Sequence, residues 1–275
     1  MERKADLHTH TTHSDGALSP YELITKAKNA GLSIISITDH DSVSALEEAV
    51  EFGKESGVEV IAGMELSTSF NDQEIHILGY FVDYRSKTLL DALAVFRGRR
   101  RKRAERIVDK LNRMNIPLRL ESVLANATGD SIGRPHIANA LVSGGHAESY
   151  HQAFSKYIGD GKPAYEKKEE YSIEDTVRLI AEAGGLSFLA HPGRSMNEAL
   201  LFQLIKAGLD GIEVIHPSHS PDLVRYYRGI VDEYCLLESG GSDFHGGAKG
   251  DETLFGRIGI PVEAVDVMRR RLFSN

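Results

Sequence analysis

Several residue types are scarce or absent in this sequence of 275 residues. The single cysteine, Cys235, excludes an internal disulfide and any metal site built from several thiolates. No apolar run approaches the roughly 18 residues that a membrane-spanning helix needs, and no apolar leader precedes the first predicted strand. Basic residues are outnumbered, 32 against 40 acidic ones, for a formal net charge of −8. We therefore expect a cytoplasmic protein without a membrane anchor and without a broad surface for duplex DNA.

Histidine is plentiful by comparison, with 12 residues in the chain. Hydrophobic residues make up 41% and charged residues 26%, which is typical of a soluble globular protein. The length fits one large domain, or one domain that carries an insertion.

Short predicted strands and helices alternate in two blocks, residues 1–84 and 172–275. This alternation predicts an α/β fold around a parallel sheet, either open or closed into a barrel. The intervening residues 85–171 are mostly helical or irregular in pattern, and we interpret them as an insertion domain that covers the active site. Within it, Arg97 to Arg103 carries six positive charges, which fits either a solvated helix face or a rim that attracts phosphate.

Histidines and carboxylates stand at the carboxyl ends of the predicted strands. His8 and His10 end the first strand two positions apart, so both side chains face the same way and can chelate one metal ion. A lone histidine at a strand end is more often a structural residue, but a whole set of isolated buried polar groups would cost about 1–3 kcal/mol each. The further candidate ligands are Asp15, His40, Glu65, His76, His191, Asp243 and His245.

Nine candidate ligands are too many for one ion and enough for two or three, with a carboxylate such as Glu65 bridging. Imidazole mixed with carboxylate suits Mn, Zn or Fe. Clustered divalent ions are characteristic of phosphoryl hydrolysis, in which they generate a hydroxide that attacks phosphorus.

Five motifs, in this order, resemble those of the PHP (polymerase and histidinol phosphatase) family of metal-dependent phosphoesterases: Asp6-Leu7-His8-Thr9-His10, Thr38-Asp39-His40-Asp41, Gly63-Met64-Glu65, Ala190-His191-Pro192 and Gly241-Ser242-Asp243-Phe244-His245. The resemblance covers essentially the whole chain and implies a distorted, TIM-like (β/α)7 barrel with a trinuclear centre. It assigns His8, His10, Glu65 and Asp243 to one ion. It assigns Glu65, His76 and His191 to the second ion, and Asp15, His40 and His245 to the third.

One segment of the insertion resembles a particular subgroup of this family. Gly133-Arg134-Pro135-His136 is similar to a segment of the subgroup that contains 3′,5′-nucleotide bisphosphatases and the 5′→3′ exoribonuclease ribonuclease AM. There the segment folds over the metals, so Arg134 and His136 are implied to donate to phosphate, although Arg-Pro-His alone also fits a turn. Arg194 and His219 are further candidates for phosphate binding, and His219 is also a candidate general acid. The remaining histidines are interpreted as structural or surface residues: His13, His146, His151 and His216.

The leading hypothesis is a metal-dependent phosphoesterase. Its expected substrate is a 3′,5′-bisphosphonucleotide or a short RNA with a 5′-phosphate. The alternatives are a histidinol-phosphate phosphatase, an amidohydrolase-like metal hydrolase, and a non-enzymatic RNA-binding or regulatory module on the same scaffold. The sequence leaves the oligomeric state and the identity of the metal open.

Overall fold

The computed structural model describes residues 4–273 except 72, 128, 130, 168–170, 195 and 248. Its eight strands form one sheet in the order β7-β6-β5-β4-β3-β2-β1-β8. The strand bounds are β1 (Lys4–Thr9), β2 (Ile34–Ile37), β3 (Glu59–Phe70), β4 (Gln73–Tyr80), β5 (Leu186–Leu189), β6 (Gly211–Ile215), β7 (Leu237–Gly240) and β8 (Ile260–Pro261).

The sheet is mixed rather than all parallel, which corrects the sequence-based expectation. β1, β2 and β3 are parallel to one another, as are β5, β6 and β7, but β4 is antiparallel to both of its neighbours. The reason is local, because only the two positions 71 and 72 separate β3 from β4, and so short a connection can join only antiparallel strands. Asn71, with a φ of 48°, is of a residue type that tolerates the left-handed conformation of such turns.

The sheet curls into a nearly closed barrel. The segment after β7 returns to the first strand, where Phe244 bridges Thr9 and the His10 amide donates to the Phe244 carbonyl at 2.8 Å. The approach is close, since a Cβ at Gly241 would lie 2.4 Å from the His8 nitrogen. The distorted barrel is therefore confirmed, with the two-residue β8 as an eighth strand, antiparallel to β1.

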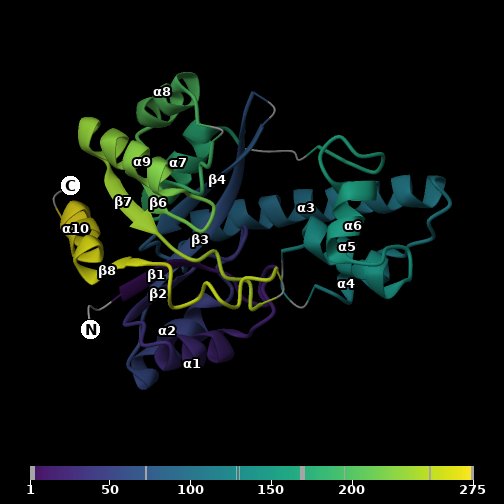
Figure 1. Cartoon of the computed structure of the whole chain (residues 1–275), viewed down its shortest axis with the longest axis horizontal. Coiled ribbons are helices and arrows are strands. Elements are labelled where there is room, and N and C mark those ends of the chain that lie inside the picture. Colours follow the sequence, from purple (N-terminus) through teal and green to yellow (C-terminus); the bar gives the residue numbers. More distant parts are fainter. Residues whose placement is uncertain are drawn as a thin grey trace.

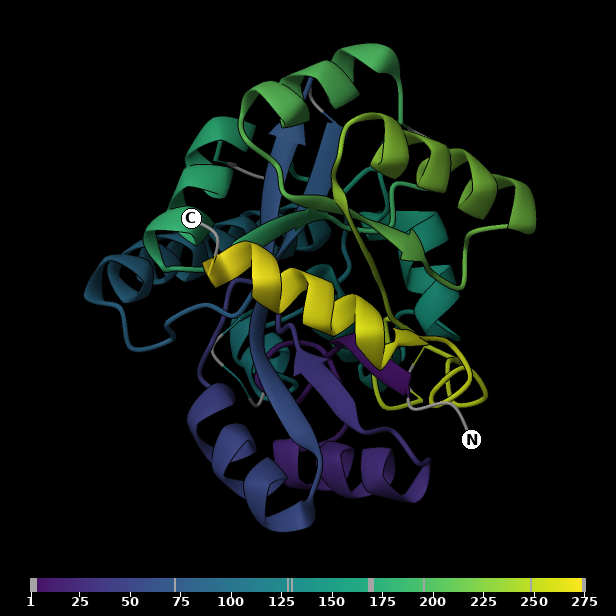
Figure 2. The same cartoon turned by 90° about the vertical axis from the view of Figure 1, so that its left-hand side faces the viewer.

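Helices surround the barrel and close one of its ends (Figures 1 and 2). In Figure 2, α10 lies across the barrel end that faces the viewer, and its Val265 and Met268 pack with the apolar side chains inside the barrel. The helices are α1 (Pro20–Asn29), α2 (Leu46–Ser56), α3 (Lys87–Arg113), α4 (Leu120–Leu124), α5 (Arg134–Ser143), α6 (Tyr150–Ala153), the π-helix η1 (Phe154–Ile158), α7 (Ile173–Glu182), α8 (Glu198–Lys206), α9 (Pro221–Glu233) and α10 (Val262–Phe273). None of the described helices combines the length and apolarity needed to cross a membrane.

The segment between β4 and α7 extends away from the barrel, with α4, α5 and α6 gathered around the far half of α3 (Figure 1). It has a hydrophobic cluster of its own, which runs from Ala104 to Ala164. The first half of α3 belongs to the barrel, since Leu89, Leu93 and Phe96 pack in the cluster beneath the barrel helices. This packing supports the interpretation of residues 85–171 as an insertion, with α3 linking its two parts.

Candidate metal centre and phosphate pocket

The candidate ligands come together at the barrel end that faces the insertion. His8 lies near the end of β1 and His10 directly follows the strand, and both side chains are completely buried. Glu65 lies inside β3, which continues to Phe70 instead of ending before it. His76 lies near the start of β4, yet it reaches the same edge because β4 runs in the opposite direction and pairs His76 with Ser67. The carboxyl-end rule therefore holds for the parallel strands and is wrong for β4.

Glu65 is the hub of this cluster. One of its oxygens, Oε2, lies 3.3 Å from Nε2 of both His8 and His10 and 3.0 Å from Nδ1 of His40. The other oxygen, Oε1, lies 2.7 Å from Nδ1 of His76 and 3.0 Å from Nε2 of His191. Five imidazoles surround this one buried carboxylate, which is more than its oxygens can engage through hydrogen bonds. The arrangement suits a Glu65 carboxylate that bridges metal ions.

The nine side chains fall into four overlapping groups whose donor atoms lie within 4.8 Å of one another. The groups are His8, His10 and Asp243; His8, Glu65 and His191; His40, Glu65 and His76; and His10, Asp15, His40 and His245. The last group contains the set expected for the third ion, with His10 in addition. His191 groups with His8 and Glu65, while His76 and His191 also lie on the same Glu65 oxygen, Oε1, as expected for the second ion.

Unsatisfied buried atoms provide a test of whether metal ions fit. Within the described part of the chain, His8 Nε2, His10 Nδ1, His40 Nδ1, Glu65 Oε2 and His245 Nε2 are buried and make no hydrogen bond. Such atoms cost about 1–3 kcal/mol each when nothing binds them. Their residues belong to the overlapping donor groups described above, and divalent cations bound by those groups would satisfy them. The donor set therefore fits divalent metal ions.

The charges of the cluster follow from its burial and its ion pairs. Burial alone would raise the pKa of Glu65, but the facing imidazoles of His40, His76 and His8 hold that pKa well below its usual range. Burial would lower the pKa of His10 and His76, but the neighbouring carboxylates raise each to about 9. Metal binding must displace these protons, because only neutral imidazole is a ligand.

Buried carboxylates outside the cluster orient it, and the sequence analysis did not identify them. Glu213 on β6 accepts hydrogen bonds from His8 Nδ1 at 2.9 Å and from the His191 amide at 2.6 Å. The first bond fixes the His8 tautomer, so that Nε2 is directed at Glu65. Asp39 accepts from the Thr11 amide and hydroxyl at 2.8 and 2.6 Å, and thereby anchors the loop that leads to Asp15.

Two of the candidate ligands have strained backbones. His191 has a φ of 26° and Asp243 a φ of 52°, values that are uncommon for residues other than glycine. Such strain persists only where the surroundings enforce it, and it concentrates at functional sites. Here the Glu213 carboxylate holds the His191 amide, which is one such constraint.

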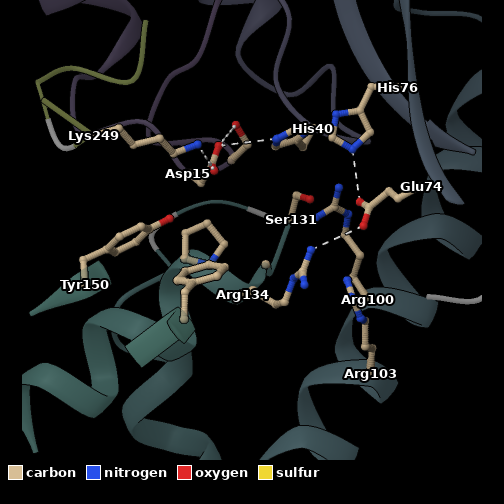
Figure 3. A pocket seen from close by; sticks show the side chains of 14 residues that line it. Asp15, His40, Glu74, His76, Arg100, Arg103, Ser131, Arg134, Tyr150 and Lys249 are labelled. Atoms are coloured by element: carbon tan, nitrogen blue, oxygen red, sulfur yellow. Dashed lines mark hydrogen bonds and ion pairs between the residues drawn. The ribbon is translucent and has the colours of Figure 1, made fainter. Parts of the chain in front are cut away.

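A cavity of about 200 Å³ opens between the cluster and the insertion (Figure 3). We call it the phosphate pocket. Its lining includes Asp15, His40 and His76 from the barrel and Arg134 from the first turn of α5. Arg134 is held from two sides by carboxylates, Asp160 and Glu74, and Glu74 in turn contacts His76 Nε2 at 3.1 Å.

Three further cations line the phosphate pocket: Arg100, Arg103 and Lys249. Arg100 and Arg103 belong to the basic run on α3, and both are buried rather than solvated. The Arg103 Nη2 and Ser131 Oγ donors are buried and have no hydrogen-bond partner among the described residues. Lys249 lies 3.0 Å from Asp15. Arg100 and Arg103 are three residues apart, and this spacing places them on the same face of a helix. That spacing was the feature of the sequence that could have identified them as neighbours.

The other predicted substrate-binding residues lie elsewhere. His136 is buried beneath the pocket, and its Nδ1 accepts a hydrogen bond from the Gly133 amide, which caps α5. His219 uses both ring nitrogens on backbone, since Nδ1 faces the Val214 carbonyl at 2.8 Å and Nε2 accepts from the Gly193 amide at 3.1 Å. In this structure one ring nitrogen of His136 and both of His219 are thus engaged by backbone groups.

His216, interpreted from sequence as structural, is located at the cluster. Its Nε2 lies 3.6 Å from Asp243 Oδ2 and makes no hydrogen bond to any described residue. Its ring centroid is 5.4 Å from that of His191. Arg194 is exposed and lies on the turn that follows His191, outside the phosphate pocket.

The geometry on its own indicates a buried multi-histidine metal site beside a cationic pocket. Comparison with known sequences then identifies the family, because the PHP domain matches residues 6–187 of this chain. The chain belongs to the PHP domain family. The predicted resemblance is thereby confirmed, and the PHP chain is a metal-dependent phosphoesterase by family.

Relatives of the PHP chain agree with this assignment. A 5′-3′ exoribonuclease of Haemophilus influenzae is 37% identical over 250 residues, which cover 89% of this chain and 91% of the relative. A 3′,5′-nucleoside bisphosphate phosphatase of Chromobacterium violaceum is 34% identical over 251 residues, covering 89% and 88%. A crystal structure from Bifidobacterium adolescentis, inferred to be a metal-dependent phosphoesterase, superposes with a TM-score of 0.90 at 30% identity, covering 98% of this chain and 96% of that one. The enzymatic hypothesis is confirmed over the non-enzymatic module.

Proposed function

We propose that this PHP phosphoesterase hydrolyses the 3′ phosphate ester of a nucleotide that also carries a 5′-phosphate. The substrate is a 3′,5′-bisphosphonucleotide or the first nucleotide of a short 5′-phosphorylated RNA. Relatives named for these two activities support the substrate class. The observation that carries the proposal is the phosphate pocket beside the histidine cluster, in which the buried donors of Arg103 and Ser131 have no partner among the described residues.

The two substrates present the same bond. In each of them, water adds to phosphorus, the bond from phosphorus to the 3′-oxygen breaks, and that oxygen takes up a proton. A bisphosphonucleotide releases inorganic phosphate, whereas an RNA releases a 5′-mononucleotide and an RNA shortened by one residue that keeps a 5′-phosphate. One site therefore suits both reactions, provided that it holds the 5′-phosphate at a fixed distance from the metal centre.

The residues that would hold the metal ions are the nine of the cluster, with Glu65 bridging: His8, His10, Asp15, His40, Glu65, His76, His191, Asp243 and His245. We propose two or three divalent ions, Mn, Zn or Fe, bound by these side chains. When bound, such ions activate the attacking water and stabilise charge on the phosphoryl oxygens. Glu213 and Asp39 keep the ligands in place through the hydrogen bonds described above.

The phosphate pocket binds the 5′-phosphate in this proposal. Arg134 offers a planar pair of donors, and Arg103 and Lys249 add positive charge around the same cavity. Arg134, Arg100 and Lys249 pair with carboxylates, namely Asp160 and Glu74, Asp41, and Asp15, whereas Arg103 keeps a buried donor without a partner among the described residues. We assign no phosphate contact to His136, because its Nδ1 is used by the backbone.

The test is a substrate comparison with the Mn²⁺-loaded protein. We expect hydrolysis of 3′-phosphoadenosine 5′-phosphate and of 5′-phosphorylated tetra-adenylate, and at least a hundredfold lower kcat/KM for histidinol phosphate and for tetra-adenylate with a 5′-hydroxyl. Glu65→Ala is expected to abolish turnover, whereas Glu182→Ala on the surface of α7 serves as the matched control. Turnover of histidinol phosphate alone would overturn the nucleotide assignment.

A further inference from the structure

Two more hollows are lined by residues close in sequence to the candidate ligand His191. The first, of about 280 Å³, shares His76 and Arg134 with the phosphate pocket and is also lined by His191 and Pro192. The second, of about 530 Å³, begins at the next residue, Gly193. We call it the tyrosine groove. The two hollows adjoin the same turn, because Pro192 lines the first and Gly193 lines the tyrosine groove, which extends to Tyr226 and Tyr227 on α9.

The tyrosine groove has a fixed aromatic wall. Tyr226 on α9 is 53% exposed, and its ring lies edge-on to that of Tyr227 at a centroid distance of 5.2 Å. Tyr227 is buried, and its hydroxyl donates to the Gly193 carbonyl at 2.6 Å. The Gly193 amide donates to His219 Nε2 at 3.1 Å. Hydrogen bonds therefore hold both the carbonyl and the amide of Gly193 in the turn that bounds the groove. The ring of Tyr226 packs against the buried ring of Tyr227.

The rest of the lining combines apolar side chains, one arginine, one serine and one carboxylate. Met196 and Leu223 are partly buried there, and Arg194 is exposed on the turn that follows His191. The carboxylate in the lining, Asp222, forms an ion pair with Arg225. An exposed tyrosine, apolar neighbours and an arginine are the components of a surface that stacks a base and contacts a phosphate without reading sequence.

We propose that the tyrosine groove binds the RNA nucleotide on the 3′ side of the scissile phosphate. Its base lies on Tyr226, and the next phosphate lies near Arg194. This inference rests on the proposed function. A bisphosphonucleotide ends at the scissile phosphoryl group and leaves the groove empty, whereas an RNA continues beyond that group. Stacking tolerates every base, as an enzyme that removes successive nucleotides requires.

The test compares two tyrosine variants on α9 with two substrates. Tyr226→Ala removes the platform, and Tyr234→Ala removes an exposed tyrosine at the other end of the same helix. The substrates are 5′-phosphorylated tetra-adenylate and 3′-phosphoadenosine 5′-phosphate. We expect Tyr226→Ala to lower kcat/KM for the tetranucleotide roughly 5- to 150-fold, the effect of losing one base stack. Its kcat/KM for the bisphosphate, and both values for Tyr234→Ala, are expected to stay within about twofold.

Salt dependence tests the second element of the groove. Arg194→Ala is expected to reduce the slope of log affinity against log salt for the tetranucleotide by about 0.7, the value for one phosphate contact on a single strand. An unchanged slope would remove Arg194 from the proposal.

Other outcomes separate the groove from the proposed function. An equal loss on both substrates would overturn the groove as an RNA-specific subsite, and so would no loss on the tetranucleotide. If the wild-type protein hydrolyses neither substrate, the proposed function fails. The groove is then judged by the binding of 3′-fluorescein-labelled 5′-phosphorylated tetra-adenylate. Equal affinity of the wild-type protein and Tyr226→Ala would overturn it.

Discussion

Glu213 offers a sharp test of how the metal centre is built, because it touches two candidate ligands and belongs to neither the ligand set nor the pocket. Its carboxylate accepts from His8 Nδ1 at 2.9 Å and from the His191 amide at 2.6 Å, at a position with no solvent exposure. Glu213→Gln keeps the size and shape of the side chain. However, a glutamine that still accepts from His8 must direct its NH₂ group at the His191 amide, which is also a donor.

One of two charge-assisted hydrogen bonds is therefore lost. A bond of that kind contributes about 1.5–3 kcal/mol, which corresponds to roughly a 10- to 150-fold change. We expect Glu213→Gln to weaken Mn²⁺ binding by that factor and to lower kcat at subsaturating Mn²⁺. This range agrees with the roughly 10- to 100-fold cost typical of substitutions that disturb a metal ligand's hydrogen-bonding partner.

The assay is a Mn²⁺ titration of chelator-treated protein, followed by calorimetry and by phosphate release from 3′-phosphoadenosine 5′-phosphate. Glu238→Gln on the adjacent strand β7 is the matched control, because its carboxylate faces Arg228 at the surface. Metal affinity within twofold of the wild type, in a variant with an unchanged circular dichroism spectrum, would refute the reasoning. Equal weakening in the control would do so as well.

Three further results are expected. Arg134→Lys should raise KM for 5′-phosphorylated substrates about tenfold with a smaller change in kcat, because lysine lacks the paired donors; unchanged steady-state KM would count against the pocket assignment. Asp39→Asn should destabilise the fold by about 1.5–3 kcal/mol in urea unfolding, since Asp39 anchors the Thr11 amide and hydroxyl, and an unaltered midpoint would show that the anchor is dispensable. The raised pKa values of His10 and His76, about 9, stabilise the chelator-treated protein fully below about pH 6.5, and this contribution is lost as pH rises through 9. The melting temperature of the chelator-treated protein should therefore decrease as the pH is raised from about 7 to about 9.5. Over the same range, the stabilisation by added Mn²⁺ should increase, because fewer protons must be displaced. Parallel pH trends with and without metal would contradict this linkage.

Local patterns predicted the parts of the site that lie at strand ends. The two-residue spacing of His8 and His10 at the end of β1 predicts a shared face, and the parallel strands bring His40 and His191 to the same edge. In the structure, Ser19 and Glu22 form a capping box at the start of α1, in which each side chain accepts a hydrogen bond from the other residue's backbone amide.

The direction of β4 was missed because the alternation of strands and helices was extended across a region that has no helix. Between β3 and β4 there is room only for a hairpin, and a hairpin reverses the strand. The hairpin lengthens β3 through Glu65 and brings His76 back to the cluster. The short connection after a run of β-forming residues was the feature of the sequence that could have predicted an antiparallel β4.

Long-range partners could not be predicted. Glu213 lies 205 positions from His8, and nothing in either local sequence pairs them. A carboxylate in an otherwise apolar strand was the only indication that Glu213 must find a buried partner. Likewise, Arg100 is buried because it forms an ion pair with Asp41. The packing of α3 against the barrel brings these two residues together.

The central claim is that the histidine cluster holds the divalent ions on which phosphoester hydrolysis depends. The direct measurement is elemental analysis and turnover of 3′-phosphoadenosine 5′-phosphate on the same sample, before chelation, after it, and after return of Mn²⁺. We predict two or three divalent ions per chain in the active protein, loss of turnover together with the metal, and recovery of both. Full turnover in protein free of divalent metal would contradict the account.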